Sequence, residues 1–176
     1  SSSSRGLGDV YKRQADAGGA NPDLDDRTGP FAFTAPPTAY RVSFAALGDG
    51  DSDARPDVLA AGADRLALYA AGIESLSNIP FSVPANFPVL NGTFGDMDND
   101  GKADLVLTGD NGTLLYTNGG DSRWAAPTNL PGATTGAVFG DADHDGDLDL
   151  LTLGPQARLL SNDGTGRYVD ISSEAG

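Results

Sequence analysis

The sequence predicts an all-β protein, organised as a partial β-propeller of about three four-stranded antiparallel blades with one leftover strand. An aspartate-rich motif recurs about every 45 residues, each copy stands between two short apolar runs, and turn-forming residues separate the further apolar runs of each unit. Four short strands in about 45 residues match one propeller blade. A sandwich would also accommodate strands at this spacing, but the internal period favours the propeller.

The recurring motif carries aspartates at relative positions 1, 3, 5 and 9, and its copies begin at Asp49, Asp96 and Asp141. Carboxylates at this density repel one another unless a hard cation lies among them. Calcium binds six to eight oxygens from carboxylates, backbone carbonyls and water. We therefore predict up to three Ca²⁺ ions, with position 7 contributing its backbone carbonyl. The predicted ligands are Asp49, Asp51, Asp53, Arg55 and Asp57 in the first motif, Asp96, Asp98, Asp100, Lys102 and Asp104 in the second, and Asp141, Asp143, Asp145, Asp147 and Asp149 in the third.

Two other interpretations of the motif fit less well. An acidic run is often only a solvated loop, but three copies in register, each with a glycine before it and an apolar run after it, argue against that. An EF-hand loop needs a bidentate Glu at position 12 and a flanking helix on each side. Position 12 is Ala60, Leu107 or Thr152 here, and the flanks lack helical periodicity.

Each unit aligns around its motif, and we place the repeats at about residues 40–83, 87–127 and 134–172. The first strand precedes the motif and the second follows it directly. A turn rich in glycine or asparagine leads to the third strand, and a polar loop leads to the fourth. We expect equivalent, buried positions on the second strands at Leu59, Val106 and Leu151.

The fourth run of each unit opens with an aromatic side chain, at Phe81, Trp124 or Tyr168. We interpret these aromatics as core residues of an outer strand rather than as ligand-stacking residues. His144, the only histidine, lies at position 4 of the third motif, and we interpret it as an exposed spacer.

Position 6 of the motif distinguishes the first copy from the others. Gly101 and Gly146 occupy it in the second and third copies, whereas the first has Ala54. The sharp turn requires a positive φ, which costs a non-glycine residue on the order of 1 kcal/mol. We therefore expect the first site to be the weakest.

The second and third motifs share the pattern Phe-Gly-Asp-x-Asp-x-Asp-Gly-x-x-Asp-Leu, at residues 94–105 and 139–150. They resemble the FG-GAP and VCBS repeats of integrin-α-like β-propellers, and residues 118–120 resemble the asparagine/glycine turn that follows in these repeats. The resemblance covers residues 31–176 and implies a calcium-binding propeller that is usually extracellular. The ending, residues 168–176, further resembles bacterial propellers that carry an ASPIC-type domain.

The beginning of the chain differs from the rest. Residues 4–14 resemble a translated sequencing adapter, and we exclude residues 1–14 from the fold. We expect residues 15–30 to be disordered or a loop, and residues 31–36 to supply the leftover strand. The propeller segment is then residues 31–176, a piece whose neighbouring blades are missing.

Composition narrows the possible partners. The net charge of −14 argues against nucleic acid as a partner. No apolar run is long enough to predict a membrane span. The absence of cysteine suits a bacterial secreted protein held together by metal rather than by disulfides, although it also suits a cytosolic protein. We expect an extracellular, cell-surface or periplasmic location.

These observations favour a recognition module in which calcium is structural and which acts in adhesion or in binding a protein or carbohydrate ligand. We expect the chain itself to lack enzymatic activity. The alternative is the propeller part of an extracellular polysaccharide-degrading lyase or hydrolase. A cluster of Lys, Arg, Tyr or His on one propeller face would favour the enzyme.

Overall fold

The computed structural model describes residues 42–62, 65–71, 76–79 and 82–174. The predictions made for residues 1–36 and for Phe81 lie outside this part of the chain. The described residues form three four-stranded antiparallel sheets, and among them no helix could span a membrane. The predicted all-β, partial-propeller fold is therefore confirmed.

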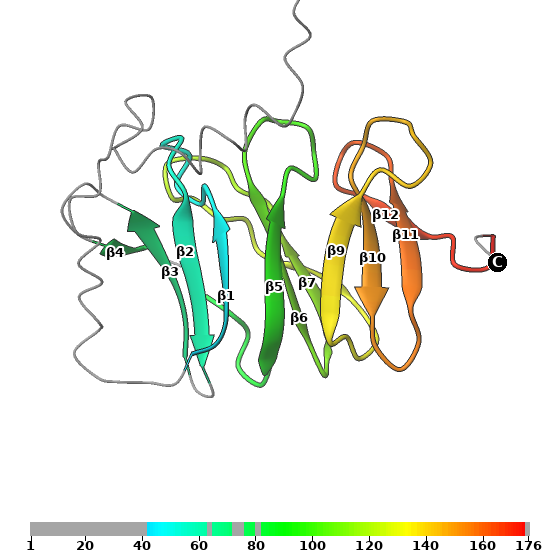
Figure 1. Ribbon diagram of the computed structural model, residues 1–176, viewed down its shortest axis with the longest axis horizontal. Helices are drawn as coiled ribbons and strands as arrows, with labels where there is room; N and C mark the ends of the chain where they lie inside the picture. The colour runs from blue at the N-terminus through cyan, green and yellow to red at the C-terminus, as the bar shows by residue number, and fades with distance from the viewer. Residues whose placement is uncertain (1–41, 63–64, 72–75, 80–81, 175–176) are drawn as a thin grey trace, which may run out of the picture. The chain divides into compact units, whose positions relative to one another are not determined.

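Each sheet is one blade, with its strands in sequence order (Figure 1). The first blade has β1 (Val42–Gly48), β2 (Asp57–Gly62), β3 (Arg65–Ala71) and β4 (Leu76–Ile79). The second has β5 (Val89–Gly95), β6 (Asp104–Gly109), β7 (Gly112–Tyr116) and β8 (Thr128–Leu130). The third has β9 (Gly136–Gly140), β10 (Asp149–Leu153), β11 (Arg158–Asn162) and β12 (Tyr168–Asp170).

The middle blade has neighbours on both faces, which explains the residues of β6. Every residue of β6 and β7 is buried. A strand covered on both faces needs apolar side chains without alternation, and Leu105, Val106 and Leu107 satisfy this need. The two-residue turn at residues 110–111 sets the register of the β6–β7 hairpin, in which Gly109 pairs with Gly112.

Two hydrophobic cores hold the blades together. The first core lies between the first and second blades and contains Leu59, Leu105 and Tyr116. The second core lies between the second and third blades and contains Val106 and Leu150. The first strands β1, β5 and β9 are neighbours along this stack, so each blade buries its faces only against adjacent blades, as in repeat proteins generally.

The glycine that precedes the first and second motifs contacts the phenylalanine that precedes the next motif, and this contact joins successive blades. A Cβ added at Gly48 would collide with the ring of Phe94, and one added at Gly95 would lie 2.6 Å from the Cδ2 atom of Phe139. A Cβ added at Gly140 would meet nothing within 4 Å. Glycine is therefore required where the phenylalanine of the next blade packs.

The burial predicted for the second strands is confirmed at two positions and wrong at the third. Leu59 and Val106 are fully buried, whereas Leu151 is 38% exposed. Leu151 lies on the face of the third blade turned away from the second, where no described residue covers it. Val138, its partner across β9–β10, is exposed on the same face.

The Phe-Gly contact predicts that Gly95→Ala lowers the free energy of unfolding by about 1–3 kcal/mol, because the new methyl group must displace Phe139. Gly140→Ala is the matched control and should change stability by less than about 0.5 kcal/mol. Urea denaturation of both variants measures the difference. Equal stabilities would contradict a role for the glycine in blade packing.

Candidate metal sites

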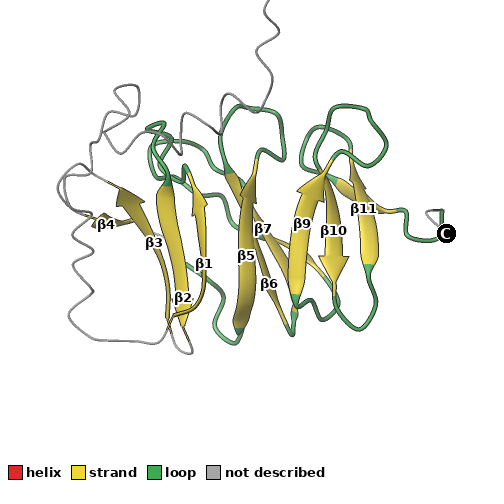
Figure 2. Ribbon diagram, viewed as in Figure 1, coloured by secondary structure: helices red, strands yellow, loops and turns green. Residues whose placement is uncertain are grey.

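The three aspartate motifs occupy the loops between the first and second strands of their blades. Figure 2 shows these loops, which follow β1, β5 and β9, at one end of the sheets. Each loop gathers its carboxylates within its own blade, so no two motifs share a pocket. Ligand atoms lie within 4.8 Å of one another in three groups, which are Asp49, Asp51 and Asp53; Asp96, Asp98 and Asp104; and Asp141, Asp143 and Asp149. The predicted carboxylate ligands Asp57, Asp100 and Asp145 lie outside these groups. The groups contain side-chain atoms only, so they leave untested the backbone carbonyls predicted for Arg55, Lys102 and Asp147.

The position-9 aspartates are buried and anchor the loops. Asp104 accepts hydrogen bonds from the backbone N–H groups of Met97 (2.7 Å) and Asn118 (2.7 Å). Asp149 receives the equivalent pair of bonds in the third blade. Burial raises the pKa of Asp104 to about 6, despite these two hydrogen bonds. The loop is therefore built around a carboxylate whose charge is poorly solvated, which a nearby cation would stabilise.

The position-1 aspartates organise the tip of the loop. Asp96 accepts hydrogen bonds from the N–H groups of Asp100 (3.1 Å) and Gly101 (2.9 Å). Asp49 accepts the same pair from Asp53 (3.0 Å) and Ala54 (2.9 Å). The backbone consequently wraps around the first carboxylate and brings the odd-numbered positions inward.

This wrapping requires left-handed residues at positions 4 and 6. Ala54 has φ 65°, which confirms the positive φ predicted at position 6, and Gly101 has φ 83°. The position-4 residues are also left-handed, which the sequence analysis missed; they are Ser52 (64°), Asn99 (58°) and His144 (65°). Asn and His are enriched in this conformation. Asn99 and His144 could therefore have indicated a left-handed position 4 from the sequence, whereas Ser52 could not. His144 is exposed, as predicted.

The side chains at position 7 are engaged as well, which sequence reasoning did not anticipate. Arg55 pairs with the position-5 carboxylate Asp53, with 2.6 Å between Nη2 and Oδ2. Lys102 likewise pairs with Asp100 and lowers the pKa of that carboxyl group through a hydrogen bond. Both pairs are at least 30% exposed, so they contribute little to stability.

One unsatisfied atom tests whether a cation fits. Asp98 Oδ1 is buried and has no hydrogen-bond partner in the described part of the protein. Burial and then the neighbouring Asp100 raise the pKa of Asp98. A buried carboxylate oxygen without a partner is costly, and a hard cation among Asp96, Asp98 and Asp104 would supply the missing interaction. The residues therefore fit calcium.

Two asparagines connect the first and second loops to the blades that follow them. Asn118 Nδ2 donates to the carbonyl oxygens of Ala103 (3.0 Å) and of Gly50 in the first blade (3.3 Å). Asn162 Nδ2 donates in the same way to Met97 of the second blade (2.8 Å). The sequence indicated only an asparagine/glycine turn here, because a contact across more than 60 residues leaves no local signal.

Position 6 generates a prediction on stability. Ala54→Gly should raise the free energy of unfolding by up to about 1 kcal/mol, because glycine adopts the left-handed conformation without a Cβ penalty. Gly101→Ala is the converse control and should lower stability by a similar amount, because alanine is strained at a φ of 83°. Its added Cβ would meet no atom within 4 Å, so the change reports this backbone strain alone. Chemical denaturation in chelator measures both, and a destabilised Ala54→Gly variant would refute this explanation.

Three comparisons place this geometry among known proteins. A family model described as an FG-GAP-like repeat matches residues 49–107 and 96–152. A search of curated proteins found no match. A solved structure from a study of specific recognition of non-reducing terminal N-acetylglucosamine by an Agrocybe aegerita lectin is similar in fold, with a TM-score of 0.54 and 19% identity. The similarity covers 74% of this chain and 38% of that one, so the chain spans well under half of the lectin's length. The two matches to the repeat model cover more than half of the sequence, and the chain belongs to the FG-GAP-like repeat family.

Proposed function

We propose that this chain is part of a calcium-stabilised recognition propeller, in which the aspartate loops hold metal for structure and another surface binds a protein or carbohydrate ligand. The observation that carries the proposal is the separation of the loops. Each lies in its own blade, and the second and third blades reach back to the preceding loops through Asn118 and Asn162. Such loops suit clamps between blades better than a shared reaction centre.

The distribution of ionisable groups supports binding rather than catalysis. The carboxylates with a raised pKa, Asp51, Asp98 and Asp104, belong to loops of the first and second blades. An active site instead gathers perturbed groups in one cleft. The FG-GAP-like repeats and the propeller fold shared with a lectin agree with a role in recognition or adhesion. We propose an extracellular or cell-surface location, where calcium is abundant.

Calcium binding is the first test of this function. Titration calorimetry should detect sites with Kd about 10⁻⁴–10⁻³ M, the range of extracellular calcium modules. At 100 times Kd, calcium should add about 2.7 kcal/mol per site to the stability of the chain. The proposal fails if elemental analysis finds no bound metal and if calcium and chelator give the same thermal midpoint.

A substitution separates site binding from bulk charge effects. Asp98→Asn should weaken one calcium site and reduce the calcium-dependent rise in Tm, because it neutralises the carboxylate whose Oδ1 atom is buried and unpartnered. Asp110→Asn removes the same charge from an exposed turn outside the loops and is the matched control. If both variants respond to calcium like the parent chain, the loops are only solvated acidic segments.

A further inference from the structure

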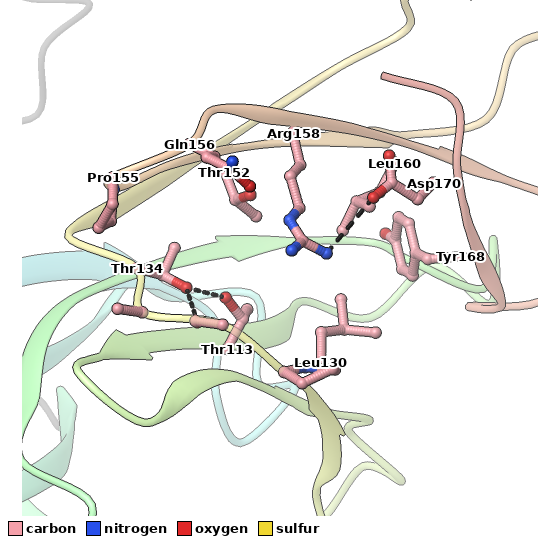
Figure 3. Close-up of a pocket in the computed structure, with 13 residues that line it drawn as sticks. Thr113, Leu130, Thr134, Thr152, Pro155, Gln156, Arg158, Leu160, Tyr168 and Asp170 are labelled. Carbon is pink, nitrogen blue, oxygen red and sulfur yellow. Dashed lines mark hydrogen bonds and ion pairs between the residues drawn. The ribbon is translucent and has the colours of Figure 1, made fainter. Parts of the chain in front are cut away.

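A groove of about 440 Å³ lies between the second and third blades, and it extends from Thr113, Gln156 and Arg158, at the end of the sheets away from the aspartate loops, to Tyr168. Figure 3 shows Arg158 extending from β11 into this groove, with Thr134 and Leu130 on the facing side. Its volume falls within the usual range of small-molecule sites. The groove uses none of the predicted metal ligands.

The residues around the groove differ from the core residues at the equivalent positions between the first and second blades. In the second blade, Leu107 and Leu114 pair across β6–β7 and are 0% and 3% exposed. The equivalent pair across β10–β11 in the third blade is Thr152 and Arg158. The alignment is fixed, because Leu107 and Thr152 each stand three residues after the position-9 aspartate of their motif.

The other positions around the groove also carry fewer apolar side chains than their equivalents at the first interface. At the first interface, Leu66, Phe87 and Val89 pack against the core. Strand register and alignment on the motifs place Thr113, Gly132 and Thr134 at the equivalent positions of the second interface, and all three line the groove. Behind them, Thr108 Oγ1 is buried without a hydrogen-bond partner in the described part of the protein. Both walls have therefore exchanged apolar groups for polar or smaller ones.

This exchange works against stability. Filling a space between blades with leucine is favourable, and replacing such a leucine by a smaller or polar residue lowers stability. The same chain packs the corresponding positions of its other interface with leucine, so the fold does not require polar groups there. Local violations of a packing rule that a protein otherwise follows are expected at functional sites.

The chemistry of the groove indicates its ligand. Arg158 and Gln156 offer donors, Asp170 offers acceptors, and the charges of Arg158 and Asp170 cancel. The buried hydroxyls of Thr113 and Thr134 already donate to Thr134 and to the Gly132 carbonyl, so they make the wall polar rather than supply its main ligand contacts. The ion pair between these two is long, 3.4 Å, and about 40% exposed, which leaves both groups accessible to a ligand. An anion would meet Asp170 and the net charge of −14, whereas a neutral molecule with many hydroxyl groups would match donors and acceptors together.

The apolar side of the groove suits the same ligand. Tyr168 lines it, and its hydroxyl group is fixed by a 3.0 Å hydrogen bond to the carbonyl of Leu148. The ring is thereby held in place beside Leu130. We propose that this groove between the second and third blades is a binding site for a neutral saccharide. The proposal rests on the recognition function above and assigns it a site and a ligand class.

The test compares the full 176-residue chain with variants in calcium. A glycan array carrying neutral and sialylated or uronate-containing glycans supplies the probes, and titration with the bound neutral glycan gives Kd. The double variant Thr152→Leu/Arg158→Leu rebuilds the leucine pair of the first interface. Arg158→Met keeps most of the side-chain length without the guanidinium, and Arg123→Met is the control, because it removes an exposed, ion-paired arginine from another loop.

The chain should bind neutral glycans, and Arg158→Met should weaken binding about tenfold or more. The double variant should lose binding while its Tm stays equal or rises, since leucine fills the groove. Arg123→Met should bind like the parent chain. Should the double variant misfold, the Arg158→Met result decides.

Other outcomes overturn the inference in distinguishable ways. Undiminished glycan binding by correctly folded Arg158→Met and double variants would place the saccharide elsewhere and leave the recognition function standing. Binding of acidic glycans alone would refute the neutral ligand class. A chain that binds calcium but no glycan would refute the saccharide site and leave protein recognition as the role of the propeller.

Discussion

The described structure depends on the hydrogen bonds that the buried carboxylate at position 9 of each motif accepts from the backbone. Asp104 is fully buried at the start of β6, and its two oxygens join the aspartate loop to the segment after β7. The second of these bonds places Asn118, whose side chain then reaches the carbonyl of Gly50 in the preceding blade. Loop conformation, blade geometry and blade stacking thus meet at one charged group, and a cation in the loop would stabilise all three.

The fold was predictable because its signals are local and repeated. The motif, the flanking apolar runs and the turns define each blade, and the left-handed φ of Ala54 follows from the glycines at the same position of the other motifs. Leu151 shows where this reasoning ends. Its sequence context matches that of Leu59 and Val106, but burial depends on a neighbouring blade, and no described residue covers that face. The reach of Asn118 and the pairing of Arg55 likewise depend on three-dimensional contacts that a repeat pattern does not encode.

Aligning the repeats to find their common features conceals the positions at which they differ. The repeat pattern gives Thr152 no role beyond occupying position 12, where an EF-hand would need a glutamate, and it gives Arg158 none. The strand register shows how unusual the two residues are. Thr152 and Arg158 pair across β10–β11 at the positions where Leu107 and Leu114 pair across β6–β7 and form core. In a repeat protein, each interface serves as an internal reference for the others.

Because the aspartate loops and the proposed saccharide site use different residues, each can place its own demands on the sequence. The loops need a fixed set of carboxylates and left-handed residues, which leaves little freedom for ligand specificity. The opposite ends of the blades carry no such requirement, so their side chains can change between repeats. The two regions remain mechanically connected, since Asn162 ties the third blade to Met97 in the loop of the second, and the groove lies between those same two blades. A cation that orders the loop of the second blade would therefore also stabilise the contact between the two blades that form the groove.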